Sequence, residues 1–252
     1  MNWETKRITV ITKAYPEESS RHGTVACTAG ITNDGEWIRL YPVDMRYFVG
    51  ANKISKFDVI EVECAKDNDK LSRKESHKIR PDSLQIVDRS LTSPKVDWTR
   101  RNKLLFPLMS DSVESLEHQY TADKTSLGMV KPNVIDFLKT DALKIYEQDR
   151  WAFTVNLKGE KVPVVTKIPH LFKYRFTSGN REHTMQCEDW ELLESYRSWG
   201  ATYENPEILW EKLKYRYFAW MQQKRDLYFI MGTHSQYPTW FIIGIYYPPK
   251  NL

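Results

Sequence analysis

The sequence predicts a β-rich α+β fold in which two β-modules are joined by a helical connector. Short alternating or apolar runs recur between turns without long helices, a spacing that is typical of barrels and sandwiches. The 9 Trp, 14 Tyr and 10 Phe residues suit β-rich cores and stacking surfaces. Helical patterns are confined to residues 97–120 and 188–224. We therefore expect residues 1–110 and 111–252 to form two domains.

The first module is expected to consist of five strands. Asn33, Asp34 and Gly35 form a turn between two apolar runs, which is a strong hairpin signal. Residues 66–78 are polar and charged, and this composition predicts an exposed loop. The predicted strands span residues 6–15, 24–32, 36–43, 57–66 and 83–88.

The connector shows signals for two short helices. Asp97 is a plausible N-cap for the first helix, which Pro107 is expected to break or bend. Asp111 and Ser112 precede a second helical segment. The domain boundary is therefore placed near residue 110.

The second module again has strand character, followed by a pair of helices. Acidic residues at the start of 188–199 suit a helix N-terminus, and Asn205-Pro206 predicts a second helix from 206 to about 224. Its stripe of Leu209, Leu213, Tyr217 and Trp220 is more typical of a core than of a ligand site. The expected strands are 127–130, 143–146, 151–157, 162–167, 172–176, 227–231 and 240–247.

Composition limits the classes of function. The net charge of +4 and the pI of about 8.8 permit nucleic-acid binding, and the basic excess lies in residues 1–110. No apolar run of membrane-spanning length or signal-peptide core is visible, so no membrane partner is expected. Three distant cysteines favour neither disulfides nor a cysteine-based zinc site and suit a reducing cytoplasm. Phosphate-loop, dinucleotide, zinc-protease and common hydrolase signatures are absent from the sequence.

Two segments carry a resemblance to a known family. CTAGITNDGEWIRLYPV contains Cys27, Ala29-Gly30, Trp37-Ile38-Arg39 and Pro42, and SLGMVKP follows at residues 126–132. Together they resemble the prokaryotic dual-OB-domain proteins, although Leu40-Tyr41 separates Arg39 from Pro42, which are adjacent in the familiar form. The resemblance implies two small OB-like or PUA-like barrels, nucleic-acid binding, and association with other subunits in defence against phages.

The strand after the Asp-Gly turn supplies the first candidate site. Trp37, Arg39 and Tyr41 alternate, so all three side chains point to one face, where aromatic rings could stack on bases and Arg39 could pair with a phosphate. The alternative is a core strand whose Arg39 is paired internally. The proposed basic-aromatic surface of the first module also includes Arg7, Lys13 and Arg46.

A second candidate region spans residues 174–191. Tyr174 and Arg175 are candidates for nucleic-acid contact. His183, Asp189 and Glu191 could hold Mg²⁺ or Mn²⁺ in a nuclease, because oxygen ligands with one imidazole suit those ions. The spacing matches no nuclease motif, and Asp189 also suits a purely structural place at a helix N-terminus.

A third candidate is the turn that joins the last two strands. His234, Tyr237 and Trp240 give it aromatic surface that could contact a nucleic acid or a partner, although a solvent-exposed turn is the simpler interpretation.

From these observations we expect a non-catalytic nucleic-acid-binding protein without a cofactor or metal site. The resemblance to the dual-OB-domain proteins implies a role in prokaryotic antiviral defence. Two alternatives remain open: a metal-dependent nuclease that uses residues 183–191, and an adaptor whose aromatic residues dock a partner protein.

Overall fold

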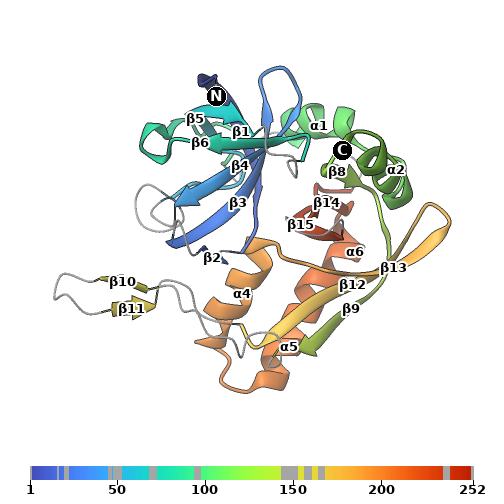
Figure 1. The fold of residues 1–252 in the computed structure, drawn as a ribbon. Helices are drawn as coiled ribbons and strands as arrows, with labels where there is room; N and C mark the ends of the chain where they lie inside the picture. Colours follow the sequence, from blue (N-terminus) through green and yellow to red (C-terminus); the bar gives the residue numbers. More distant parts are fainter. Residues whose placement is uncertain are drawn as a thin grey trace.

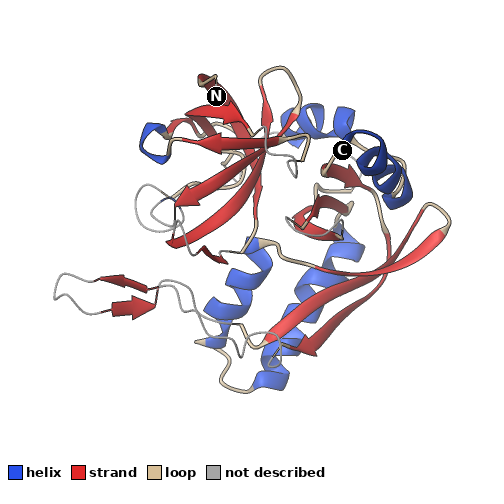
Figure 2. Cartoon of the chain, viewed as in Figure 1, coloured by secondary structure: helices blue, strands red, loops and turns tan. Residues whose placement is uncertain are grey.

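A computed structural model of the chain describes residues 2–15, 17–19, 23–44, 47, 53–67, 73–93, 98–142, 153–155, 161–163, 168–234 and 239–250. The expected β-rich α+β fold class is confirmed (Figures 1 and 2). A barrel holds the N-terminal strands, and smaller sheets and the C-terminal helices lie beside it (Figure 1).

The first seven strands form one sheet that closes into an OB-like barrel. The strand order is β1-β3-β4-β6-β5-β7, and pairing of β1 with β5 closes the ring of five strands. Among the strand pairs that the structure describes in this sheet, only β4–β6 is parallel, while β2 is attached to β3 and β7 to β5. The strands are β1 (Glu4–Lys13), β2 (Glu17–Ser19), β3 (Gly23–Thr32), β4 (Trp37–Asp44), β5 (Val59–Lys66), β6 (Ser76–Ile79) and β7 (Gln85–Asp88).

The local sequence explains most of this barrel. Gly35 has a φ of +79°, which the tight turn between β3 and β4 requires and which glycine adopts without strain. Ile8, Ile38, Leu40 and Ile60 fill the barrel interior. The five predicted strands are confirmed with small shifts at their ends. Residues 66–78 were expected to form a loop, and this prediction is wrong for the last three of them, because β6 begins at Ser76.

The predicted helical connector is confirmed. It consists of α1 (Trp98–Leu105), a 3-10 turn (Phe106–Leu108) that holds Pro107, and α2 (Val113–Asp123). Ser112 caps α2, and its hydroxyl accepts a hydrogen bond from the backbone N–H of Ser115. Asp97, the predicted cap of α1, lies outside the described residues.

The second half contains two three-stranded antiparallel sheets, ordered β13-β12-β9 and β15-β14-β8. Residues 143–146, expected as a strand, lie outside the described part of the chain. The sequence analysis did not identify β9 or β13, both of which carry many polar residues. The strands are β8 (Leu127–Val130), β9 (Asn133–Asp141), β12 (His170–Ser178), β13 (Arg181–Gln186), β14 (Tyr228–Thr233) and β15 (Trp240–Tyr246), with a separate hairpin of β10 (Phe153–Val155) and β11 (Lys161–Pro163).

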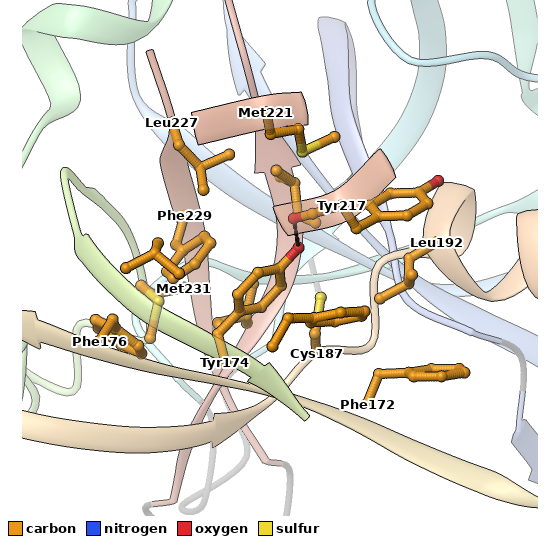
Figure 3. Close-up of a cluster of buried hydrophobic side chains, with 14 of the residues drawn as sticks. Phe172, Tyr174, Phe176, Cys187, Leu192, Tyr217, Met221, Leu227, Phe229 and Met231 are labelled. Atoms are coloured by element: carbon orange, nitrogen blue, oxygen red, sulfur yellow. Dashed lines mark hydrogen bonds between the residues drawn. The ribbon is translucent and has the colours of Figure 1, made fainter. Parts of the chain in front are cut away.

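Both helices expected near the C-terminus are present, and the second begins at its predicted cap, Asn205. Asp189 caps α4 (Trp190–Gly200), and Asn205 caps α5 (Pro206–Lys214). A π-helical segment (Tyr215–Trp220) continues α5 into α6 (Met221–Lys224). The helices pack on β12 around Phe172, Tyr174 and Phe176 (Figure 3). In that core the Tyr174 hydroxyl donates a 2.7 Å hydrogen bond to the Tyr217 carbonyl (Figure 3).

A third apolar cluster joins the two halves of the chain. Ile11, Ala29 and Ile31 on the outer face of β1 and β3 pack against residues of β8, β14 and β15 such as Met129 and Ile243. The second half therefore covers one outer face of the barrel. Whether residues 1–110 and 111–252 fold as separate domains stays a prediction. In the described residues, no helix is both long and apolar enough to span a membrane.

Candidate nucleic-acid interface

The predicted row on β4 is not a free surface, and its central residue is buried. Arg39 is 2% exposed, whereas Tyr41 is 37% exposed and Trp37 packs partly into the cluster between the halves. Arg39 Nη2 donates to the Ser126 carbonyl at 2.9 Å, and Nη1 donates to Cys27 Sγ at 3.2 Å. The expectation that Arg39 pairs with a phosphate is therefore wrong, because the β15-β14-β8 sheet covers the face from which Arg39 projects.

The other first-half candidates are separated from one another. The Arg7 guanidinium is exposed, 3.5 Å from Glu61 Oε1. Lys13 is buried, and its ammonium group donates to the Ile54 carbonyl at 2.6 Å. Burial lowers the pKa of Lys13 to about 8. Lys13 therefore does not belong to an exposed basic patch, and Arg46 lies outside the described residues.

In the second half, two of the predicted nucleic-acid contacts are core residues. Tyr174 is fully buried and Trp240 is 6% exposed, so neither ring is available for stacking. Arg175 is exposed, with Nη1 3.9 Å from Glu182. The backbone of half-buried His234 donates to the Thr239 carbonyl at 3.0 Å. Tyr237 lies outside the described part of the chain.

The proposed metal ligands engage different partners. His183 on β13 is buried, and its Nε2 lies 3.3 Å from Oε1 of Glu114 on α2. Asp189 Oδ1 instead accepts from two backbone N–H groups of α4. Asp189 Oδ2 and Glu191 Oε2 lie 3.4 Å and 3.3 Å from Lys56 Nζ. The described residues contain no group of three or more His, Cys, Asp or Glu side chains placed to hold a metal ion. The metal site that the nuclease alternative would need from His183, Asp189 and Glu191 is therefore not formed in the described residues.

The structure brings together a different basic and aromatic set, which we call the cation–aromatic row. Its members alternate between guanidinium groups and rings, and they come from both halves of the chain. In spatial order they are Phe57, Arg101, Trp98, Arg225, Trp220, Arg216 and Tyr247.

The row is buried at one end and half-buried along the rest. Arg101 Cζ lies 4.3 Å from the ring centre of Phe57 and 4.6 Å from that of Trp98. Burial lowers the pKa of Arg101. Arg101 also donates through Nε to the Leu91 carbonyl at 2.9 Å. The Phe57 end of the row therefore anchors it to the barrel and α1.

The other end lies on the last turns of the long helix. Arg225 Cζ lies 6.0 Å from the ring centre of Trp98 and 5.0 Å from that of Trp220. Arg216 Cζ lies 3.8 Å from the ring centre of Trp220 and 5.6 Å from that of Tyr247. Among the described residues, no carboxylate lies within ion-pair distance of Arg216 or Arg225, and the Arg225 Nε atom is buried without a hydrogen-bond partner.

Backbone geometry explains how Arg216 and Trp220 meet. They are four residues apart on a helix, so their side chains share a face. Both lie in the π-helical segment, a distortion that is frequent at functional sites. This spacing, together with the Trp and Arg residues in WTRR at 98–101, is the sequence signal that could have identified the row. The sequence analysis instead placed Trp220 in the apolar stripe of the helix, so the cation–aromatic row was not predicted.

Two protein families match adjacent parts of the chain. Residues 4–107 match the family described as Domain of unknown function (DUF8758), and residues 109–252 match the family described as Domain of unknown function (DUF8757). No curated protein matches the chain.

Several solved structures are similar at low TM-score. A replication protein A heterotrimer bound to ssDNA gives a TM-score of 0.40 at 10% identity, with coverage of 99% of this chain and 50% of that chain. The p204 HINb domain gives 0.35 at 10% identity, covering 98% and 96%. A murine DNA binding protein bound with dsDNA gives 0.34 at 9% identity, covering 75% and 74%. Because its match covers more than half of the sequence, the chain belongs to the family described as Domain of unknown function (DUF8757).

Proposed function

We propose that this protein binds nucleic acid, without catalysis of its own, through the cation–aromatic row. The observation that carries the proposal is the alternation of Arg216 and Arg225 with Trp98, Trp220 and Tyr247. Bases stack on aromatic rings and on guanidinium planes, and guanidinium groups pair with phosphates. A half-buried row of both kinds matches the chemistry of a nucleic-acid strand.

Charge supports the choice of a polyanionic ligand. Lys103 on α1 and Lys224 on α6 are exposed and add positive charge to the elements that carry the row. The acidic neighbour Asp226 lies 3.5 Å from Lys131 Nζ, which partly neutralises it. Because Arg216 and Arg225 have no carboxylate at ion-pair distance in the described residues, phosphates can approach them without displacing an internal partner.

The binding site can be tested with a single substitution and a matched control. Arg216→Gln removes one guanidinium, whereas Arg197→Gln removes an arginine that is paired with Glu194 on α4. Fluorescence anisotropy with ssDNA, dsDNA and RNA at two salt concentrations measures affinity and its salt dependence. We expect Arg216→Gln to weaken binding and to reduce the salt slope by about one. Equal binding by the folded Arg216→Gln variant and the wild type would contradict the proposal.

Stacking is tested separately from charge. Trp220→Leu keeps an apolar side chain but removes the ring, and a stacked base contributes about 1–3 kcal/mol. We expect the affinity to fall while the salt slope stays unchanged. If Trp220→Leu binds like the wild type in the same assay, the Trp220 ring contacts Arg216 and Arg225 but does not stack on a base.

The resemblance of residues 27–43 and 126–132 to prokaryotic dual-OB-domain proteins supports a place in cytoplasmic anti-phage defence, with other subunits as partners. A host strain that lacks the gene is expected to plate phages more efficiently than one that carries it. The Arg216→Gln allele should behave like the deletion if nucleic-acid binding is required, and the Arg197→Gln allele should protect. Unchanged plating across a broad phage panel would argue against this role.

A further inference from the structure

Phe57, at the buried end of the cation–aromatic row, has an unusual backbone conformation. Its φ is +71°, in the left-handed region that a bulky residue rarely adopts. Its side chain is 3% exposed, and its ring centre lies 4.3 Å from Arg101 Cζ. The backbone N–H of Phe57 donates to the Val10 carbonyl of β1 at 2.7 Å. The barrel therefore holds the Phe57 ring in a fixed place beside Arg101.

The buried carboxylate of Asp58 stabilises the turn that carries Phe57. Asp58 is fully buried, and its Oδ2 accepts from the backbone N–H of Ser55 at 2.8 Å. The backbone N–H of Asp58 in turn donates to the Ser55 carbonyl at 3.1 Å. These two hydrogen bonds close the 55–58 turn and offset the cost of the left-handed conformation at Phe57.

The other oxygen of the same carboxylate holds a second segment of the chain. Asp58 Oδ1 accepts a 2.6 Å hydrogen bond from the hydroxyl of Thr92. Thr92 follows Leu91, whose carbonyl accepts from Arg101 Nε at 2.9 Å. One carboxylate therefore fixes both the 55–58 turn and the carbonyl group that binds Arg101.

Arg101 connects these supports to Trp98. The two residues are three positions apart on α1, so their side chains share a face, and Arg101 Cζ lies 4.6 Å from the Trp98 ring centre. Arg101 is 7% exposed and points its guanidinium at rings and carbonyls of the chain, so it is not placed to bind a phosphate. Trp98 is half-buried, and its ring also faces Arg225. Arg101 therefore supports Trp98 and does not itself contact a ligand.

We infer that Asp58 and Thr92 are positioning residues for the cation–aromatic row. Through Arg101 they hold the Trp98 ring in the place where a base stacks on it. Their role in binding rests on the proposed function, since the position of Trp98 matters to a ligand only if the row binds nucleic acid. Because Asp58 is fully buried, it acts on a ligand only through its neighbours.

Thr92→Val tests this role, because it removes the hydroxyl that binds Asp58 while it keeps the size of the side chain. Thr92→Ser keeps the hydroxyl and is the rescue variant. The control is Thr121→Val, which removes an exposed hydroxyl on α2 that donates to the Glu117 carbonyl. All three variants are made in the full chain, and circular dichroism checks that each one folds.

The first measurement needs no nucleic acid. In protein labelled with fluorotryptophan, the fluorine NMR signal of Trp98 is assigned from its absence in Trp98→Phe. We expect Thr92→Val to shift this signal, whereas Thr92→Ser and Thr121→Val should leave it in place. An unmoved Trp98 signal in the folded Thr92→Val variant would overturn the positioning role.

The second measurement is fluorescence anisotropy with ssDNA, dsDNA and RNA. We expect Thr92→Val to weaken binding by up to about fivefold, the fold-change that one lost hydrogen bond gives. The salt slope should stay unchanged, because no phosphate contact is removed. Equal affinity of Thr92→Val and the wild type would overturn the role in binding. Absence of binding by the wild type would instead overturn the proposed function, and the Trp98 signal would still decide whether Thr92 positions the ring.

Discussion

Arg39 on β4 and Ser126, just before β8, are joined by a 2.9 Å hydrogen bond from the guanidinium to the backbone carbonyl. Ser126 is also held by Glu75, whose carboxylate accepts from its hydroxyl at 2.7 Å and from its backbone N–H at 3.0 Å. These contacts link the barrel to the start of the second sheet. The Arg39 guanidinium, which the sequence predicts to contact a phosphate, therefore binds another part of the same chain.

Arg39→Ala is expected to lower the free energy of unfolding by about 2–3 kcal/mol, because a buried hydrogen bond from a charged group is lost. The salt slope of nucleic-acid binding should stay unchanged. Urea denaturation and anisotropy measure the two quantities. Arg7→Ala, which removes an exposed arginine beside Glu61, should change stability by no more than about 0.5 kcal/mol. A stable Arg39→Ala variant with a reduced salt slope would restore the phosphate-contact interpretation.

Trp240→Ala should cost about 3–5 kcal/mol of stability, because it truncates a buried aromatic side chain. Trp240 is 6% exposed and meets Tyr120 with the ring centres 6.5 Å apart. Tyr215 is 58% exposed, so Tyr215→Ala serves as the control and should cost less than about 1 kcal/mol. Thermal denaturation compares the two variants. Similar melting temperatures would show that Trp240 is not a core residue in solution.

Gly128→Ala should destabilise the protein by about 1–3 kcal/mol through overpacking. A Cβ atom at Gly128 would meet the side chain of buried Leu116 on α2, with Leu116 Cγ at 3.3 Å. The cost of Gly128→Ala should shrink when Leu116 is already alanine, and a double-mutant cycle measures this coupling. At Gly200 the nearest atom would be 3.8 Å away, so Gly200→Ala is the tolerated control. Additive effects of Gly128→Ala and Leu116→Ala would contradict close packing of α2 on β8.

Lys13 should make stability depend on pH above 8. Burial lowers its pKa from 10.5 in a free lysine to about 8 in the folded chain, so between these values the unfolded chain binds more protons. The free energy of unfolding of the wild type should therefore rise relative to that of Lys13→Met as the pH increases from 8 to 10.5. The rise should be at most about 3 kcal/mol. A stability difference between the two proteins that is flat over this range would show that the Lys13 pKa is unshifted.

Much of the fold follows from local sequence. The Asp34-Gly35 turn, the Asn205 cap and the stripe of Leu209, Leu213 and Tyr217 each act over a few residues, so the hairpin, the helix start and the buried face could be predicted. Strand β9 was missed because partners distant in sequence, rather than its own alternation, hold it in a sheet.

The candidate site depends on distance in space and could not be predicted in the same way. The sequence by itself determined the strands, the capped helices, the mild positive charge and the supply of Trp and Arg residues. Only the tertiary structure decided that Arg39 bonds to Ser126 while Arg225 lies between Trp98 and Trp220. The physical reason is that alternation along a strand fixes which face a side chain takes, whereas packing of a distant sheet decides whether that face meets solvent or protein.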